Sequence, residues 1–137
     1  MATDTNTRYI EGIGRRKTAT ARVRITPAKT ANKVTVNGKE YADYFCHASL
    51  QQDVVSVLDT KEAGIEYYTI TVKVSGGGLS AQAGAVRLGI ARALVKEKED
   101  RRIPLKREGF LKRDPRSVER KKFGLRKSRK RPAWSKR

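Results

Sequence analysis

The sequence has 137 residues, enough for one domain, and 32 Lys and Arg against 14 Asp and Glu give a formal net charge of +18. Because self-repulsion of such a charge opposes a compact state, we expect a polyanionic partner: RNA, DNA or an anionic membrane. The membrane is disfavoured, since no stretch reaches the roughly 18 apolar residues of a span and residues 1–7 resemble neither a signal nor a transit peptide. The single cysteine, Cys46, excludes an internal disulfide and favours a reducing, cytosolic environment.

The positive charge is concentrated toward one end of the sequence. Residues 101–137 hold 17 Lys or Arg against 3 Asp or Glu, a net +14, which leaves +4 for residues 1–100. We therefore expect a flexible N-terminus over residues 1–7, a globular domain over 8–100 and an extended basic tail over 101–137. The tail has too little apolar area to fold alone, so we expect it to become ordered on RNA.

The first half of the globular part is rich in alternating patterns. Residues 8–25 predict two strands joined by a basic connection, Arg15-Arg16-Lys17, and the second strand places small apolar residues on one face until Pro27 ends it. Residues 34–36 predict a third short strand that meets a tight turn at Asn37-Gly38.

Helical patterns follow, with one more strand between them. Residues 41–58 predict two short helices, the second with a capping box made by Ser49 and Gln52. Residues 66–75 alternate most clearly as a strand, and residues 79–98 predict a long helix. This order of elements predicts an α+β domain with a mixed sheet packed against helices.

The long helix is apolar on two opposite faces, which indicates that it is covered on two sides. Small residues and two cations lie between these faces, and we interpret this wedge as a place where a phosphate backbone can approach. The wedge comprises Gln82, Ala85, Gly89, Arg92 and Lys96. The preceding Gly76–Gly78 turn lacks the Gly-Lys-Ser/Thr of a nucleotide loop, so it is either a packing turn or a helix start whose positive dipole end meets an RNA phosphate.

We find no constellation of side chains that would support catalysis. Cys46 and His47 are adjacent, so neither can easily activate the other, and no second Cys or His exists to complete a metal site. The carboxylates show no pairing pattern for acid–base work. We therefore expect a protein that is not an enzyme, with no metal, no cofactor and no small-molecule substrate.

Three long motifs resemble one family in the right order. The stretch from Gly12 to Val23 resembles the N-terminal signature of universal small-subunit ribosomal protein nine, and the stretch from Gly76 to Leu94 resembles its central motif. Arg113-Asp114-Pro115-Arg116, the segment 119–124 and the ending Ser135-Lys136-Arg137 are similar to its C-terminus. The resemblance covers nearly the whole sequence and is to the bacterial form of the family.

The resemblance implies a fold like the second domain of ribosomal protein five, with a left-handed βαβ crossover. It implies a cytoplasmic, ribosomal location in the head of the small subunit, on the 3′ major domain of the small-subunit rRNA and beside other head proteins. It further implies that Ser135, Lys136 and Arg137 contact the anticodon stem-loop of P-site tRNA. One departure lies at the tip, where members often carry Gln and this sequence has Ala133, followed by Trp134.

We assign rRNA binding to cations of both parts, because arginine forks and lysine ammonium groups pair with phosphates. They are Arg15, Arg16, Lys17, Arg22, Arg24, Arg87, Arg92, Arg107, Lys112, Arg113, Arg116, Arg120, Lys121, Lys122, Arg126, Lys127, Arg129, Lys130 and Arg131. Two rival functions stay open at this point: a free RNA chaperone, which sedimentation apart from small subunits would reveal, and a nucleotide-dependent enzyme, which ATP or GTP binding would reveal.

Overall fold

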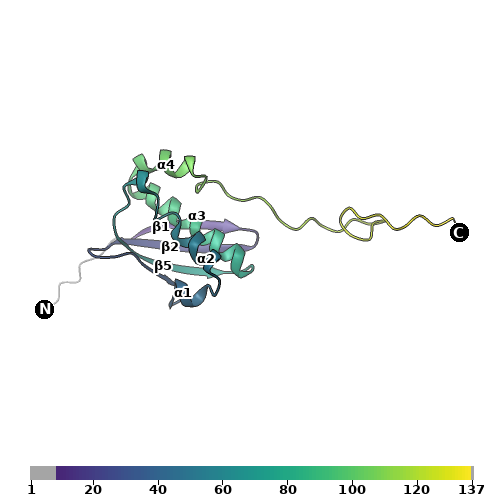
Figure 1. Cartoon of the computed structure of the whole chain (residues 1–137), viewed down its shortest axis with the longest axis horizontal. Helices are drawn as coiled ribbons and strands as arrows, with labels where there is room; N and C mark the ends of the chain where they lie inside the picture. The colour runs from purple at the N-terminus through teal and green to yellow at the C-terminus, as the bar shows by residue number, and fades with distance from the viewer. Residues whose placement is uncertain (1–8, 137) are drawn as a thin grey trace.

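A single five-stranded sheet organises the folded part of the chain, as the computed structural model of residues 9–136 shows (Figure 1). Its strands are β1 (Ile10–Arg16), β2 (Ala19–Pro27), β3 (Lys33–Val36), β4 (Lys39–Glu40) and β5 (Tyr68–Ser75), in the spatial order β1-β2-β5-β3-β4. Neighbouring strands are antiparallel except β3 and β5, which are parallel. The predicted α+β class with a mixed sheet is therefore confirmed.

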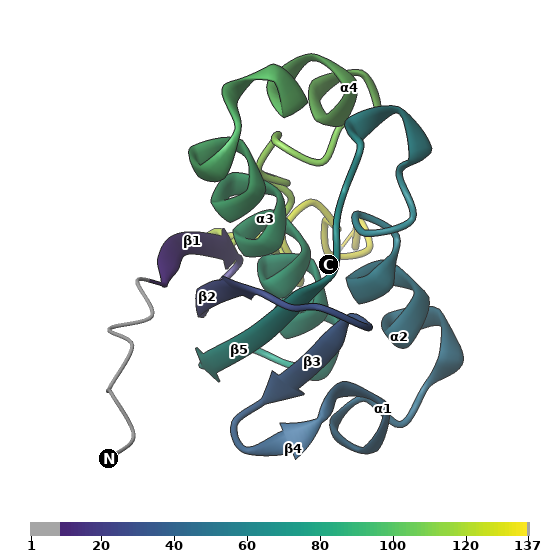
Figure 2. The same cartoon turned by 90° about the vertical axis from the view of Figure 1, so that its left-hand side faces the viewer.

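The helices gather on one face of this sheet (Figure 2). They are α1 (Tyr41–Tyr44), α2 (Ala48–Val55), α3 (Leu79–Glu97) and α4 (Arg102–Arg107), with 3₁₀ turns at Lys61–Ala63 and Glu99–Arg101. The long helix α3 packs against β1 and β2, and α2 packs against α3 from the other side. This arrangement confirms that α3 is covered on two sides. Among the described residues, no helix combines the length and the apolar character that a membrane span requires.

Strand alternation defines the core, as the sequence predicted. Ala19, Ala21, Val23 and Ile25 of β2 are buried beneath α3, and the alternate residues of β5 from Tyr68 to Val74 are buried beside them. Apolar side chains on one face of each strand thus form one continuous core with the helices. Turn chemistry is also as expected, because Asn37 and Gly38 both have positive φ between β3 and β4.

Two local predictions are wrong. Arg15 and Arg16 belong to β1 rather than to a connection, so the turn into β2 consists of Lys17, with φ of 52°, and Thr18. Helix α2 begins after His47 with no side-chain cap, and Ser49 lies inside the helix instead of capping it. The amide of Gln51 holds this region together instead, because its Nε2 donates hydrogen bonds to the carbonyls of Ala42 and Phe45 at 3.0 and 2.7 Å.

The proposed phosphate wedge of α3 is also wrong, because strand β1 already occupies it. A Cβ added at Gly14 would lie 1.8 Å from the carbonyl oxygen of Ala85, and one added at Gly89 would lie 2.6 Å from Val23 Cγ2. Glycines on both elements therefore let the strand and the helix backbones touch, which leaves no room for a phosphate backbone at Ala85 and Gly89. The small residues serve helix–sheet packing.

The core continues past residue 100, the end that we predicted for the globular part. Leu105 of α4 is fully buried, and Phe110 and Leu111 pack against the core. Arg101 is only 2% exposed and donates hydrogen bonds to Tyr68 Oη, Glu97 Oε2 and the carbonyl of Ala63. From residue 112 onward the described chain contains neither helix nor strand and leads away from the folded part (Figure 1).

Candidate nucleic-acid interface

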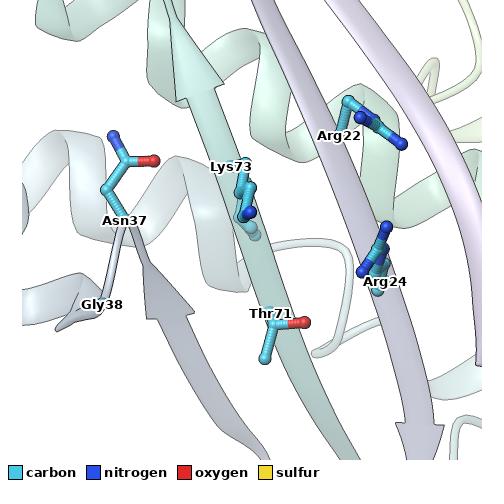
Figure 3. A pocket seen from close by; sticks show the side chains of 7 residues that line it. Arg22, Arg24, Asn37, Gly38, Thr71 and Lys73 are labelled. Atoms are coloured by element: carbon cyan, nitrogen blue, oxygen red, sulfur yellow. The ribbon is translucent and has the colours of Figure 1, made fainter.

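The sheet has one face free of helices, which we call the outer face. The side chains that β1, β2 and β5 place on it come from alternate positions: Glu11, Ile13, Arg15, Thr20, Arg22, Arg24, Thr26, Thr69, Thr71, Lys73 and Ser75. Four of these residues are cations and one is an acid. Figure 3 shows Arg22 and Arg24 on one strand beside Lys73 and Thr71 on the next. The predicted RNA-binding residues Arg22 and Arg24 therefore lie together on one surface.

Glu11 is the one acid that β1, β2 and β5 place on the outer face, and two arginines share it. Arg22 Nε lies 3.2 Å from Glu11 Oε1, and Arg24 Nε lies 3.3 Å from Glu11 Oε2. The hydrogen bond from Arg22, assisted by Arg24, holds the pKa of Glu11 below its usual value. The carboxylate thus stays ionised and orients both guanidinium groups. Arg24 also stacks on the ring of Tyr9, with 4.4 Å from Cζ to the centroid.

The three members of the predicted basic triplet point in different directions, because strand alternation separates them. Arg15 is exposed on the outer face, whereas Arg16 points to the helical side. Lys17 is exposed in the turn that follows. Of the three residues, Arg15 and Lys17 thus have exposed side chains, and Arg16 is engaged within the protein.

Arg16 joins the folded domain to the root of the tail. Its Nη2 lies 3.1 Å from Asp114 Oδ2, and its Nη1 donates to the carbonyl of Ser80 in the first turn of α3 at 3.5 Å. The side chain crosses α3 above Gly84, where an added Cβ would lie 2.7 Å from Arg16 Cδ. This position explains the glycine, and it fixes the point at which the tail leaves the domain.

Asp114 binds a second arginine, Arg116, two residues further along the tail. Arg116 Nη2 lies 3.0 Å from Asp114 Oδ2, and the backbone nitrogen of Arg116 donates to Asp114 Oδ1 at 3.0 Å. The side-chain hydrogen bond from Arg116 is the largest of the interactions that hold the pKa of Asp114 well below its usual range. We call Arg16, Asp114 and Arg116 the tail anchor.

Three cations of α3 make contacts within the protein: Arg87 and Arg92, which we assigned to rRNA, and Lys96, which we placed in the wedge. Arg92 Nη1 donates to the carbonyl of Ile13 at 2.8 Å, and Lys96 Nζ donates to the carbonyl of Glu11 at 3.2 Å. Both carbonyls lie on β1, an outermost strand of the sheet. Arg87 Nη1 lies 3.1 Å from Asp53 Oδ1 of α2.

The N-terminus of α3 has the polarity that an anion requires. Gly78 is the N-cap residue, no side chain caps the helix, and its first turn contains no acid. Gly76 and Gly77 have φ of 75° and 64°, which lets the chain turn sharply from β5 into the helix. Gln82 stabilises this turn, because its Nε2 donates to the carbonyl of Gly76 at 3.0 Å.

Nearly all of the described tail is exposed, and a single acid organises its outer part. Glu119 accepts hydrogen bonds from Lys122 and from Arg129 Nε, the latter at 2.8 Å, while Ser128 Oγ donates to the carbonyl of Glu119 at 2.7 Å. The chain between Glu119 and Arg129 consequently closes into a loop, visible in Figure 1, which we call the tail loop. Phe123 within this loop is 99% exposed.

The remaining predicted tail residues are exposed. They are Arg107, Lys112, Arg113, Arg120, Lys121, Arg126, Lys127, Lys130 and Arg131 for rRNA, and Ser135 and Lys136 for tRNA. Trp134 beside them is 86% exposed. Arg137 and the predicted flexible segment 1–7 lie outside the described residues. Exposed cations interleaved with exposed aromatic rings are typical of surfaces that bind single-stranded nucleic acid.

The sequence analysis left three residues of the outer face and the tail unassigned. Lys73 stands on the outward face of a strand that was correctly predicted, so the alternation was the signal that could have found it. Asp114 and Glu119 hold the tail anchor and the tail loop. Their partners are specified by tertiary contacts that no local pattern encodes.

Comparison with known proteins agrees with the geometry. The family model described as Ribosomal protein S9/S16 matches residues 14–137. "Small ribosomal subunit protein uS9" of Gloeothece citriformis is 51% identical over 140 residues, covering 100% of this chain and 99% of the relative. "Small ribosomal subunit protein uS9" of Thermotoga neapolitana is 50% identical over 129 residues, covering 92% of this chain and 94% of the relative.

The chain belongs to the ribosomal protein S9/S16 family. It is accordingly a structural constituent of the small ribosomal subunit, with rRNA and other ribosomal proteins as partners. Membership confirms the predicted ribosomal location and the prediction that the chain is not an enzyme. Both rivals, the free chaperone and the nucleotide-dependent enzyme, are thereby set aside.

Proposed function

We propose that the chain binds the 3′ major domain of small-subunit rRNA in the head and that its tail reaches the anticodon stem-loop of P-site tRNA. The observation that carries this proposal is the division of charge, since +14 of the total +18 belongs to residues 101–137, most of which extend away from the domain (Figure 1). A folded domain that holds a long cationic tail at a fixed root is suited to contact RNA at two separate places.

In this proposal the domain and the tail bind different parts of the rRNA. Exposed cations of the domain, Arg15, Lys17, Arg22 and Arg24, bind rRNA phosphates at the surface of the head, and neighbouring head proteins complete the site. The tail cations up to Arg131 follow rRNA inward, with the exposed rings of Phe123 and Trp134 available to stack on unpaired bases. The parallel pair of β3 and β5, joined through α1 and α2, supports a crossover like that of ribosomal protein five, for which we propose the left-handed sense.

The tip of the tail has a role of its own in this proposal. Lys136 and Arg137 supply positive charge for the tRNA phosphates, and Ser135 supplies a hydroxyl. Ala133 occupies the position where related proteins often carry glutamine, so Trp134 offers a ring in place of an amide. The tip therefore binds tRNA through charge and stacking rather than through an amide contact.

Removal of Ser135, Lys136 and Arg137 tests this role. We expect small subunits to assemble nearly normally, because the folded domain and the upstream cations remain, while P-site tRNA dissociates faster. The measurement is the dissociation rate of labelled tRNA from purified subunits. A double variant, Lys130→Gln with Arg131→Gln, serves as the control because it removes the same two positive charges from an upstream position. An unchanged tRNA dissociation rate in the truncated subunits would contradict the proposed role of the tip.

A further inference from the structure

We infer that the outer face of the sheet is a binding surface for an unpaired strand of RNA, whose phosphates lie over Arg22, Arg24 and Lys73. The inference rests on the proposed function, binding of small-subunit rRNA, and deepens it by naming the face of the domain and the kind of RNA that it takes. The outer face is distinct from the tail, which carries most of the charge.

Strand register brings like charges together on this face. Arg22 of β2 is the direct cross-strand partner of Lys73 in β5, and Arg24 is the partner of Thr71. Like charges directly opposite each other destabilise a sheet. Glu11 lies on the far side of Arg22 from Lys73 and is shared with Arg24, so it leaves the three cations with a net charge of about +2. An anion over the strands removes this repulsion.

A shallow hollow on the outer face gives that anion a place. It has a volume of about 390 Å³ and is lined by Arg22, Arg24, Asn37, Gly38, Thr71, Val72 and Lys73 (Figure 3). Arg22, Arg24 and Lys73 line it together, so three cationic groups are available to pair with phosphates there. The Asn37 amide binds the backbone nitrogen and carbonyl of Val74, each at 3.0 Å, so it shapes the rim of the hollow.

An aromatic ring beside these cations favours unpaired RNA over a duplex. Tyr9 is 49% exposed and lies against Arg24, so the guanidinium fixes the ring while part of it still meets solvent. Unpaired bases stack on such rings, whereas bases within a duplex are not available for stacking. Thr71 adds a hydroxyl that can meet a phosphate or a 2′-hydroxyl group. An acidic protein surface would pair with the same cations, so the experiments below separate that occupant from RNA.

Lys73→Gln in the full-length chain is the decisive variant, because Lys73 is exposed and makes no ion pair among the described residues. Its affinity for small-subunit rRNA is measured across a salt series. We expect the slope of log K against log salt to become less steep by about 0.7, the value for one phosphate of a single strand. Lys61→Gln, an equal charge change on the helical side, should leave the slope unchanged.

Tyr9→Leu tests the unpaired strand separately from the phosphate contacts. We expect roughly fivefold weaker binding with an unchanged salt slope, because a stacked base contributes affinity without releasing counterions. Thermal unfolding of each variant checks that the fold is intact. If the Lys73→Gln slope equals that of the wild type while the wild type still binds rRNA, the inference falls and the proposed function stands.

Two further results would overturn the inference in other ways. Unchanged affinity of the Tyr9→Leu variant would remove the assignment to an unpaired strand. The Lys73→Gln variant could also leave the salt slope of rRNA binding unchanged while small subunits that contain it lack a neighbouring protein. That result would assign the outer face to an acidic protein partner instead. If the wild-type chain shows no measurable binding to rRNA, the proposed function is refuted as well.

Discussion

Asp114 is a small side chain with a large effect on where the tail begins. It binds Arg16 of β1 and Arg116 of the tail at once, so it ties an otherwise exposed segment to the folded domain. The two arginines are separated by 100 positions in the sequence, which means that the tail anchor forms only when the domain is folded. A fixed root restricts the directions that the tail samples before it meets RNA.

We expect Asp114→Ala to release the tail root, because both arginines lose their shared carboxylate. The measurement is a distance distribution between spin labels on native Cys46, which is exposed, and on Ser117→Cys. The distribution should broaden in the variant. Asp59→Ala is a suitable control, since Asp59 is an exposed acid outside the tail anchor. An equally narrow distribution in Asp114→Ala would show that the carboxylate does not hold the root.

The tail anchor should also be insensitive to pH in the neutral range. Arg116 and Arg16 hold the pKa of Asp114 well below its usual range, so the carboxylate contributes to stability above its unfolded pKa and loses that contribution only as the pH falls through the lower folded value. We therefore expect the same label distances at pH 5 and pH 8. Broadening at pH 5 alone would mean that the carboxyl is protonated there.

Among the contacts between elements, the one between β1 and α3 has the largest effect on the orientation of the tail root. Gly12 and Gly14 of the strand face Ala85, Gly89 and Ala93 of the helix with no side chain between them. Such close approach positions the helix relative to the sheet, and it thereby places Arg16 over the first turn of α3. The orientation of the tail root depends on this packing.

We expect Gly14→Ala to destabilise the domain by about 1–3 kcal/mol, because the new Cβ would meet the Ala85 carbonyl and must push strand and helix apart. Urea unfolding of the full chain measures the change. Gly78→Ala is the matched control, since an added Cβ there meets nothing within 4 Å and an N-cap change costs about 1 kcal/mol or less. Equal stabilities of the two variants would show that the close approach is not required.

Sequence patterns predicted the elements well and the contacts between them poorly. Alternation in β2 and β5 reflects burial on one face, which is local information, so these strands and their faces were predictable. The wedge of α3 was misread because a helical wheel gives the angle of Gly89 but not the element that meets it. The contacts of Arg92 and Lys96 were unpredictable for the same reason, since their acceptors are backbone carbonyls of a distant strand.

At the scale of the whole molecule, the tail reaches less far than a fully extended chain of the same number of residues would. Ten positions separate Glu119 from Arg129, a length that covers roughly 33 Å when extended, yet their side chains are 2.8 Å apart. The tail loop therefore takes up chain that would otherwise extend the reach of the tip. Because the ion pairs that close it are exposed, salt weakens them.

We expect Glu119→Gln to open the tail loop and to lengthen the molecule. Small-angle X-ray scattering at low salt should show a larger maximum dimension than for the wild type, and high salt should lengthen the wild type toward the variant. Glu108→Gln, at the end of α4, is the control for an equal charge change. Identical maximum dimensions for Glu119→Gln and the wild type would mean that the loop is not held by this acid.

Arg92 and Lys96 have one more consequence, which concerns self-association. Strand β1 is the outermost strand of the sheet, and an open strand edge pairs readily with a strand of another molecule. The two cations occupy carbonyls of that edge, and the opposite edge, β4, consists of two residues. The hydrogen bonds to β1 and the shortness of β4 both disfavour pairing of the sheet edges with a second copy of the chain before RNA is bound.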